Sequence, residues 1–495
     1  MNVNPITRLD YPDPDVIRVE DTYYMVSTTM HFMPGCEILQ SFDLVHWEHV
    51  TYVYETLDHT DAQQLKSGQN IYGQGMWAAS LRYHEGRFCI CFVANDTRKT
   101  YLYTSEKIDG PWKKQLIEGF YHDGSLLFDE DGRNYIVYGN DEIWITELNE
   151  DLTAPKKDGL HRLLVSDHKN PELGYEGSHI QKINGYYYIF LIHSLRDRWM
   201  RTEACFYSDS LEGEFTGGDV LCDDRGYCGQ GVAQGGIVDT PDGKWYAMLF
   251  QDSGAVGRIP ILLPVTWKDH FPFFGQNGHV PEEIEVHSTR PGYIYQPLVG
   301  SDDFCNGLLP RWQFNHDPDP RYYHLDALQG TYTITTREVC TELTQAVNTL
   351  TQRMSYPSCA AEVTVDASAL KEGDIAGLCA LQSCYAAVGI TKHHGKYEVL
   401  MLDKKEDGIL DMTEGTVVES HQMDFRLEAD FCNMKDEARC YYRVNKGDWL
   451  PIGTVHKLYF KLDHFTGCRF GLFCYAAEET GGSACFRDFK YYDVD

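Results

Sequence analysis

Three acidic residues occupy one repeated position in the N-terminal part of the chain. Five turns, centred on residues 22, 86, 132, 185 and 243, each lead into an aromatic-rich apolar run. The residue nine positions before the turn is Asp13, Trp77, Asp123, Glu176 or Gln234. Two carboxyl groups across a cleft can cleave a glycosidic bond, because a protonated one donates to the leaving oxygen while an ionised one activates water.

A third carboxylate near such a pair is chemically useful. Its like charge raises the pKa of the acid and helps to keep it protonated near neutral pH. Two alternatives stay open at this point. Asp and Glu oxygens also ligate calcium well, and most of the 74 acidic residues of this chain are expected to be solvated at the surface.

The elements around these residues are predicted to be β-strands. From residue 1 to about 295, short runs rich in Tyr, Phe, Val and Ile are broken by Gly and Asp turns, and long helical periodicity is absent. Successive turns are about 45 to 65 residues apart, which is typical of a four-stranded propeller blade with its loops. Five units predict five blades.

A propeller would bring the repeated positions together. The innermost strand of each blade lines the central channel, so equivalent residues should converge at one depth. Asp13, Asp123 and Glu176 are therefore expected to face one another, although they are far apart in sequence.

The second half of the chain changes in character. Residues 287–303 contain Pro-Gly and Gly-Ser pairs, which are typical of a linker. Alternating apolar and polar runs continue from there to the C-terminus between short turns, which predicts a β-sandwich. We therefore expect an all-β protein with a catalytic five-bladed β-propeller at 1–295 and a β-sandwich at 303–495.

Composition excludes several classes of partner. The formal net charge is −31 at pH 7, which repels nucleic acid and anionic membranes and suits a neutral substrate. The sequence has no basic region followed by an apolar stretch at its start and no apolar run of membrane-spanning length, so a cytoplasmic location is expected. The 16 cysteines are scattered through apolar runs and are expected to be reduced. Oligomeric state is not predicted.

At the acidic residues, the sequence resembles glycoside hydrolase family 43, five-bladed propeller enzymes that act on xylose- and arabinose-containing polysaccharides. Asn-Pro at 4–5 with Pro-Asp-Pro at 12–14 resembles the motif of the general base, which implies that role for Asp13. His-Asp-Gly-Ser at 122–125 resembles the motif of the residue that adjusts the acid's pKa and orients substrate, here Asp123. Glu-Gly-Ser-His at 176–179 resembles the motif of the general acid, here Glu176. The resemblance also implies inversion of anomeric configuration.

The same resemblance extends to the C-terminal region. Residues 371–378, Lys-Glu-Gly-Asp-Ile-Ala-Gly-Leu, resemble the C-terminal domain of the β-xylosidase and α-L-arabinofuranosidase branch, which implies a concanavalin-like sandwich.

Five further residues are candidate substrate contacts. Trp77 could stack on a sugar or be a buried propeller aromatic. His31 and Phe32 could line the sugar pocket or belong to a packed loop. Arg258 resembles the family's substrate-binding arginine, with a structural ion pair as the alternative. Gln234 departs from the family, because many members place near this position a histidine that helps to hold a central metal ion. No cofactor is expected for the chemistry, and whether a structural calcium ion binds is left open.

The predicted function is an exo-acting inverting glycosidase that releases terminal β-D-xylosyl or α-L-arabinofuranosyl units from xylan-derived oligosaccharides. One alternative is an endo-arabinanase, which would need an open groove. Another is a sugar-binding propeller without turnover, although a lectin has no need for an acid and a base across a bond. The sequence does not distinguish xylose from arabinofuranose.

Overall fold

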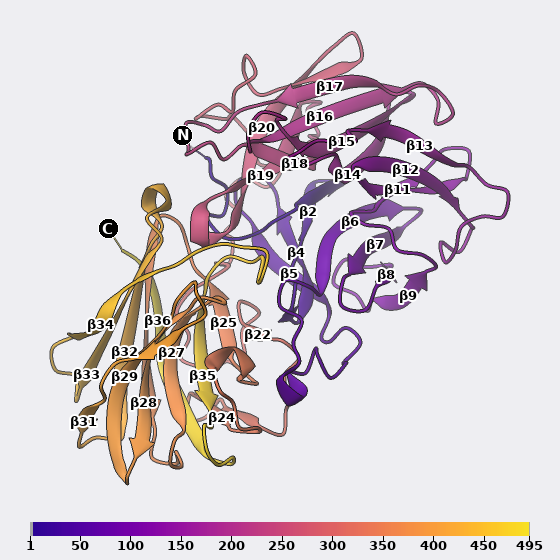
Figure 1. Cartoon of the computed structure of the whole chain (residues 1–495). Coiled ribbons are helices and arrows are strands. Elements are labelled where there is room, and N and C mark those ends of the chain that lie inside the picture. Colours follow the sequence, from indigo (N-terminus) through magenta and orange to yellow (C-terminus); the bar gives the residue numbers. More distant parts are fainter. Residues whose placement is uncertain (1–2, 495) are drawn as a thin grey trace.

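The fold is described from a computed structural model, which covers residues 3–494. It consists of a five-bladed β-propeller followed by a β-sandwich, as predicted. Figure 1 shows the propeller, coloured indigo to pink, beside the orange and yellow sandwich. The only helices in the described part of the chain are single 3-10 turns, and none is long and apolar enough to cross a bilayer.

Each blade is an antiparallel sheet of four strands. The inner strands are β1, β6, β10, β14 and β18, and apolar clusters fill the spaces between neighbouring blades. The five sheets in chain order are β1 (Asp15–Val19), β2 (Thr22–Ser27), β4 (Gly35–Ser41) and β5 (Glu48–Tyr54); β6 (Met76–His84), β7 (Arg87–Ala94), β8 (Lys99–Ser105) and β9 (Lys113–Ile117); β10 (Ser125–Phe128), β11 (Asn134–Asn140), β12 (Glu142–Leu148) and β13 (His161–Ser166); β14 (Glu176–Ile183), β15 (Tyr186–Ser194), β16 (Arg201–Ser208) and β17 (Thr216–Leu221); β18 (Val232–Asp239), β19 (Trp245–Asp252), β20 (Arg258–Lys268) and β21 (Phe271–Phe274).

The repeated turns join the first and second strands of each blade. Gly86, Gly132, Gly185 and Gly243 have φ between +78° and +85°, and no other atom lies within 4 Å of the Cβ that a side chain would add. Glycine is used there because it adopts this left-handed conformation without a steric penalty. The repeat seen in the sequence is therefore the first hairpin of a blade.

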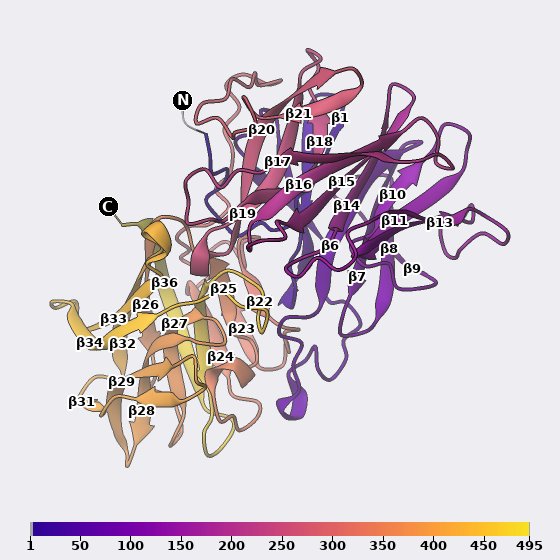
Figure 2. The ribbon, with the colours of Figure 1, turned by 45° about the horizontal axis from the view of Figure 1, so that its top comes forward.

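The sandwich packs two antiparallel sheets around one large apolar core. Figure 2 shows the strands of both sheets from a second direction. One sheet contains β22 (Gln313–Asn315), β25 (Leu350–Arg353), β35 (Arg469–Tyr475), β27 (Ile375–Leu381), β28 (Ala386–His393), β29 (Lys396–Lys404), β30 (Leu410–Met412) and β31 (Thr416–Val418). The other contains β23 (Tyr323–Asp326), β24 (Thr331–Thr335), β36 (Ser483–Asp493), β26 (Ser358–Asp366), β32 (Gln422–Asp430), β33 (Glu437–Val444) and β34 (Leu450–Lys457).

One strand of the sandwich comes from the propeller. Strand β3 (Phe32–Met33), which lies between β2 and β4 in the chain, pairs antiparallel with β22 and forms the edge of the larger sandwich sheet. The Arg469 guanidinium of β35 stacks on the Phe32 ring at 3.4 Å. The two domains thus share a continuous sheet.

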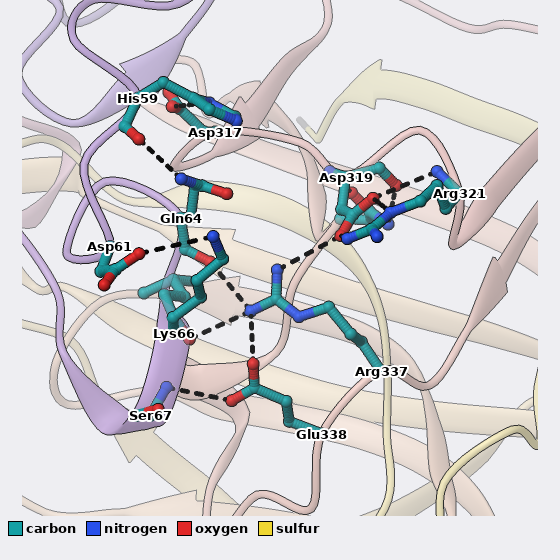
Figure 3. A network of polar contacts seen from close by, with 12 residues as sticks. His59, Asp61, Gln64, Lys66, Ser67, Asp317, Asp319, Arg321, Arg337 and Glu338 are labelled. Atoms are coloured by element: carbon teal, nitrogen blue, oxygen red, sulfur yellow. Dashed lines mark hydrogen bonds and ion pairs between the residues drawn. The ribbon is translucent and has the colours of Figure 1, made fainter.

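A polar network also joins the domains (Figure 3). It connects the loop that includes η1 (Lys66–Gly68) with the start of the sandwich. Arg337 Nη2 donates to the carbonyl oxygens of Gln64 (2.9 Å) and Leu65 (3.2 Å). His59 Nδ1 lies 2.8 Å from Asp317 Oδ2, and the Ser67 amide donates to Glu338 Oε2 at 3.1 Å. The remaining helical turns are η2 (Gly254–Val256), η3 (Leu343–Gln345) and η4 (Cys432–Met434).

Candidate active site

The backbone is irregular where each inner strand begins. Asp13, Asp123 and Gln234 have φ of 53°, 48° and 60°, and strands β6, β14 and β18 each shift register near their first residues. Such bulges re-aim side chains, and left-handed non-glycine residues concentrate at functional sites. One cavity is consequently lined by all five repeated positions, which are Asp13, Trp77, Asp123, Glu176 and Gln234.

This cavity has a volume of about 940 Å³, within the range of cavities that hold drug-sized ligands. Its propeller wall includes Asn95, Arg98, Phe120, Trp199 and Arg201 besides the repeated positions. Its opposite wall comes from the sandwich, through residues 457–462 and Phe465. The site is therefore built by both domains.

Asp13 is buried at the base of the cavity and is 6 % exposed. Thr28 Oγ1 donates to Asp13 Oδ2 at 2.6 Å, and Arg258 Nη1 donates to Asp13 Oδ1 at 3.0 Å. Both contacts suit an ionised carboxylate, which is the form that a general base requires.

Asp123 and Glu176 both lie beside the same ring nitrogen of His122. Nε2 of His122 is 3.6 Å from Asp123 Oδ2 and 3.6 Å from Glu176 Oε2. Asn140 Nδ2 donates to Glu176 Oε2 at 2.6 Å, and the Gly177 amide donates to Asp123 Oδ2 at 3.1 Å. The glutamate is the most accessible of the three acids, with a side chain that is 19 % exposed.

The charges of this group are interdependent. Burial raises the pKa of Asp123 to about 6, opposed by the charge of His122 and reinforced by Glu176 and Asp13. The charge of Asp123 in turn raises the pKa of His122 to about 9, against the effect of burial. At neutral pH an imidazolium therefore lies beside two carboxyl groups.

Trp77 and Arg258 also lie where they can contact a ligand. The half-buried Trp77 ring is 5.7 Å from the rings of both His122 and Phe465. Arg258, only 2 % exposed, forms an ion pair with Asp13 and stacks over Phe465 at 4.2 Å. Arg258 thus lines the cavity, where a substrate contact is expected, and is also held in a structural ion pair.

Gln234 is buried in the cavity wall. Its backbone N–H donates to Glu203 Oε2 at 2.7 Å. A Cβ at Gly177 would lie 2.7 Å from Gln234 Cδ, so the glycine after Glu176 leaves room for this side chain.

His31 and Phe32 do not line the cavity, and for these two residues the prediction of pocket contacts is wrong. Phe32 belongs to β3 and packs in the sandwich sheet. His31 is fully buried beside His316 and His464 of the sandwich, with ring centroids 4.9 and 5.7 Å away. The physical reason is that this loop is drawn into the sandwich by strand pairing.

Several cavity residues were not identified from the sequence. His122 precedes Asp123 in the recognised motif, so its position was visible although its role was not. Thr28 and Asn140 had no signal of their own. Phe465 and residues 457–462 reach the cavity only because the sandwich folds back onto the propeller.

Paired carboxyl groups in a propeller cavity suit glycoside hydrolysis, and comparisons with known proteins give the class and the family. The model for glycosyl hydrolases family 43 matches residues 3–272, and the model for the β-xylosidase C-terminal concanavalin A-like domain matches residues 301–492. The chain belongs to glycoside hydrolase family 43 and is a glycosidase.

Individual relatives cover the whole chain. A β-xylosidase from Formosa agariphila is 26 % identical over all of this chain and 89 % of its own length. Xylosidase/arabinosidase 43B from Humicola insolens is 25 % identical over 99 % of this chain and 96 % of its own. A structure described as a bifunctional GH43-CE from Bacteroides eggerthii is 42 % identical, with a TM-score of 0.93, and this chain spans 64 % of it.

Proposed function

We propose that the protein is an inverting exo-glycosidase that releases terminal β-D-xylosyl or α-L-arabinofuranosyl units from xylan-derived oligosaccharides. The observation that carries the proposal is the convergence of Asp13, Asp123 and Glu176 on one cavity. The names of the relatives support the sugar class, since they include both xylosidases and arabinosidases.

In the proposed reaction, Glu176 donates its proton to the glycosidic oxygen while the bond from that oxygen to the anomeric carbon breaks. Asp13 accepts a proton from a water molecule, whose oxygen forms the new bond to the anomeric carbon from the opposite face. The sugar leaves with inverted configuration, and the displaced alcohol carries the proton from Glu176. Asp123 holds its like charge near Glu176 and accepts hydrogen bonds from the sugar.

Exo action is supported by the wall that the sandwich adds. Residues 457–462 and Phe465 stand across the cavity from the propeller, and Phe465 contacts both Trp77 and Arg258. A long polysaccharide needs a groove that is open at both ends, whereas a chain end needs one opening. This arrangement favours a chain end over the endo-arabinanase alternative.

The decisive experiment is hydrolysis of nitrophenyl β-D-xyloside and nitrophenyl α-L-arabinofuranoside, followed by product analysis on arabinoxylan oligosaccharides. We expect single pentose units as the first products, and NMR of the first-formed anomer should show inversion. Asp13→Asn is the inactive control. Release of oligosaccharides from linear arabinan would instead establish endo action, and failure to cleave any of these substrates with intact folding would contradict the proposal.

A further inference from the structure

Arg82 lies where the inner strands of the propeller converge, and it does not line the catalytic cavity. It projects from β6, and its side chain is 12 % exposed. The guanidinium contacts the inner strands of four blades, β1, β6, β10 and β14. It donates to Leu126 O (2.9 Å), Asp15 Oδ2 (2.7 Å), Leu81 O (2.6 Å), Ser125 Oγ (2.7 Å) and Ile180 O (3.2 Å).

The main counter-ion of Arg82 is Asp15, which is fully buried. Asp15 also accepts from the Leu81 amide at 2.7 Å and lies 3.1 Å from His179 Nδ1. Burial would raise the pKa of Asp15, but the charges of Arg82 and His179 and its hydrogen bonds outweigh this, and the net shift is downward. The carboxylate is therefore held ionised.

The fifth blade leaves space for this network. A Cβ at Gly236 of β18 would lie 3.4 Å from His179 Nδ1 and 3.6 Å from Asp15 Oδ1. A longer side chain at that position would meet the network. Four inner strands therefore contact the Arg82 guanidinium, and the fifth leaves room for its partners Asp15 and His179.

Family resemblance suggests a central metal ion, and the residues of this channel do not fit one. Calcium takes six to eight oxygen ligands at about 2.3–2.6 Å. Here a carboxylate, a hydroxyl and three carbonyl oxygens already accept hydrogen bonds from the guanidinium. An added metal ion would lie beside a positive charge and lose those ligands.

A group of three residues in the catalytic cavity has the spacing of metal ligands. Among residues 3–494, the ligand atoms of His122, Asp123 and Glu176 lie within 4.8 Å of one another. These three residues are the proposed general acid, the residue that adjusts its pKa and the imidazole beside both, so they belong to the active site already described and not to the channel around Arg82.

We propose that Arg82 is the built-in cation of the channel and that it binds the inner strands together in place of a metal ion. It binds the oxygen groups of four inner strands together and positions Asp13, because Asp15 lies two residues beyond Asp13 on the same backbone. The channel between the inner strands accordingly needs no divalent metal.

Chelation of the intact protein is the first test. Exhaustive treatment with EDTA followed by dialysis should leave both the melting temperature and kcat/KM unchanged, and added Ca²⁺ should not raise either. A fall in the melting temperature on chelation, restored by Ca²⁺, would overturn the proposal. Because this readout is thermal, it does not depend on the proposed substrate.

Removal of the guanidinium is the second test. Arg82→Ala should lower the melting temperature by several degrees, and low millimolar guanidinium or Ca²⁺ should recover part of that loss. The matched control is Arg18→Ala, which removes an arginine of β1 paired with Asp239, and which should gain no response to either cation. An Arg82→Ala protein as stable as the wild type would contradict the inference.

If Arg82→Ala does not fold, a second pair of variants tests the charge. Arg82→Lys should fold and keep more activity than Arg82→Met, and equal losses in those two variants would contradict a role for the charge.

Discussion

Two layers of the same channel use carboxylates in opposite ways. In the upper layer, Asp13, Asp123 and Glu176 face a cavity and share the cations Arg258 and His122. In the lower layer, Asp15 is sealed from solvent by Arg82 and His179. The same repeated strands supply both layers, only two residues apart.

The difference lies in how completely charge is matched. Each oxygen of Asp15 has a donor within 3.1 Å, which is what a buried ion pair needs if its loss of hydration is to be offset. The upper layer holds three acids at one end of a cavity, so their protonation depends on one another and on a ligand. We infer that the lower layer determines stability and the upper layer determines activity.

The sharpest test places one substitution in each layer. Asp13→Asn should lower kcat/KM by about 10²–10⁴-fold, because an amide keeps the shape but cannot accept the proton of water. Its melting temperature should fall less than that of Asp15→Asn, because Arg258 keeps its hydrogen bond to the Phe465 carbonyl and its stacking on the Phe465 ring. Asp15→Asn should instead destabilise the fold by about 3–5 kcal/mol, because it leaves the Arg82 charge unmatched. Activity assays and thermal melts of both variants are compared with Asp21→Asn, an exposed acid of blade one that should behave as wild type. Comparable losses of stability in the first two variants would remove the distinction.

Glu176→Gln sharpens the assignment within the upper layer. The variant should lose about 10²–10⁴-fold in kcat/KM on xylo-oligosaccharides, whose leaving group needs a proton. Its loss on an activated aryl glycoside should be much smaller, because that leaving group departs without protonation. The comparison of leaving groups serves as its own control, and equal losses on both substrates would exclude Glu176 as the general acid.

A smaller effect is expected from the two charges beside Glu176. Asp123→Asn removes a negative charge, so the acid should lose its proton at lower pH, and the alkaline limb of the kcat/KM profile should move toward acid. His122→Asn removes a positive charge that persists up to about pH 9, so the limb should move the other way. Each shift should be about one pH unit or less after screening. Since the amide introduced by Asp123→Asn could still accept from Gly177, a limb that stays in place with a lower melting temperature would indicate a purely structural Asp123.

The last prediction concerns the three buried histidines His31, His316 and His464. Burial lowers the pKa of His31 and of His316 well below 6.5, and that of His464 to about 3, with Arg469 adding to the effect at His31 and Asp463 opposing it at His464. Below pH 6.5 the unfolded chain binds protons that the native state excludes, so stability falls by up to about 1.4 kcal/mol per pH unit for each histidine.

His31→Phe should therefore reduce the loss of melting temperature between pH 6.5 and 5, and the measurement is a series of thermal melts across that window. The matched control is His46→Phe, at a histidine whose side chain is 64 % exposed. An identical pH dependence in wild type and His31→Phe would show that this cluster does not titrate on unfolding.

The sequence predicted features that repeat and missed features that depend on the second domain. Asp13, Asp123 and Glu176 were found because a blade repeats its first hairpin, and the glycine turns fix the spacing to the inner strand. His31 and Phe32 were misplaced because β3 pairs with β22, about 280 residues further along the chain. Phe465 was missed for the same reason, since no local pattern records which sandwich loop closes the cavity. Arg82 was equally hidden, because an arginine in a strand looks like a surface residue until its five acceptors are known.

The shared sheet has a consequence for recombining these domains. Because β3 leaves the first blade to become an edge of the sandwich, a cut in the linker separates sequence but not structure. A propeller expressed alone would expose β3 without its partner strand and the Phe32 ring without Arg469. The sandwich expressed alone would expose β22 as an unpaired sheet edge. Chimeras of related enzymes should therefore exchange the loop at 30–34 together with the C-terminal domain, so that the crossover follows the hydrogen-bonded sheet rather than the boundary between the two sequence families.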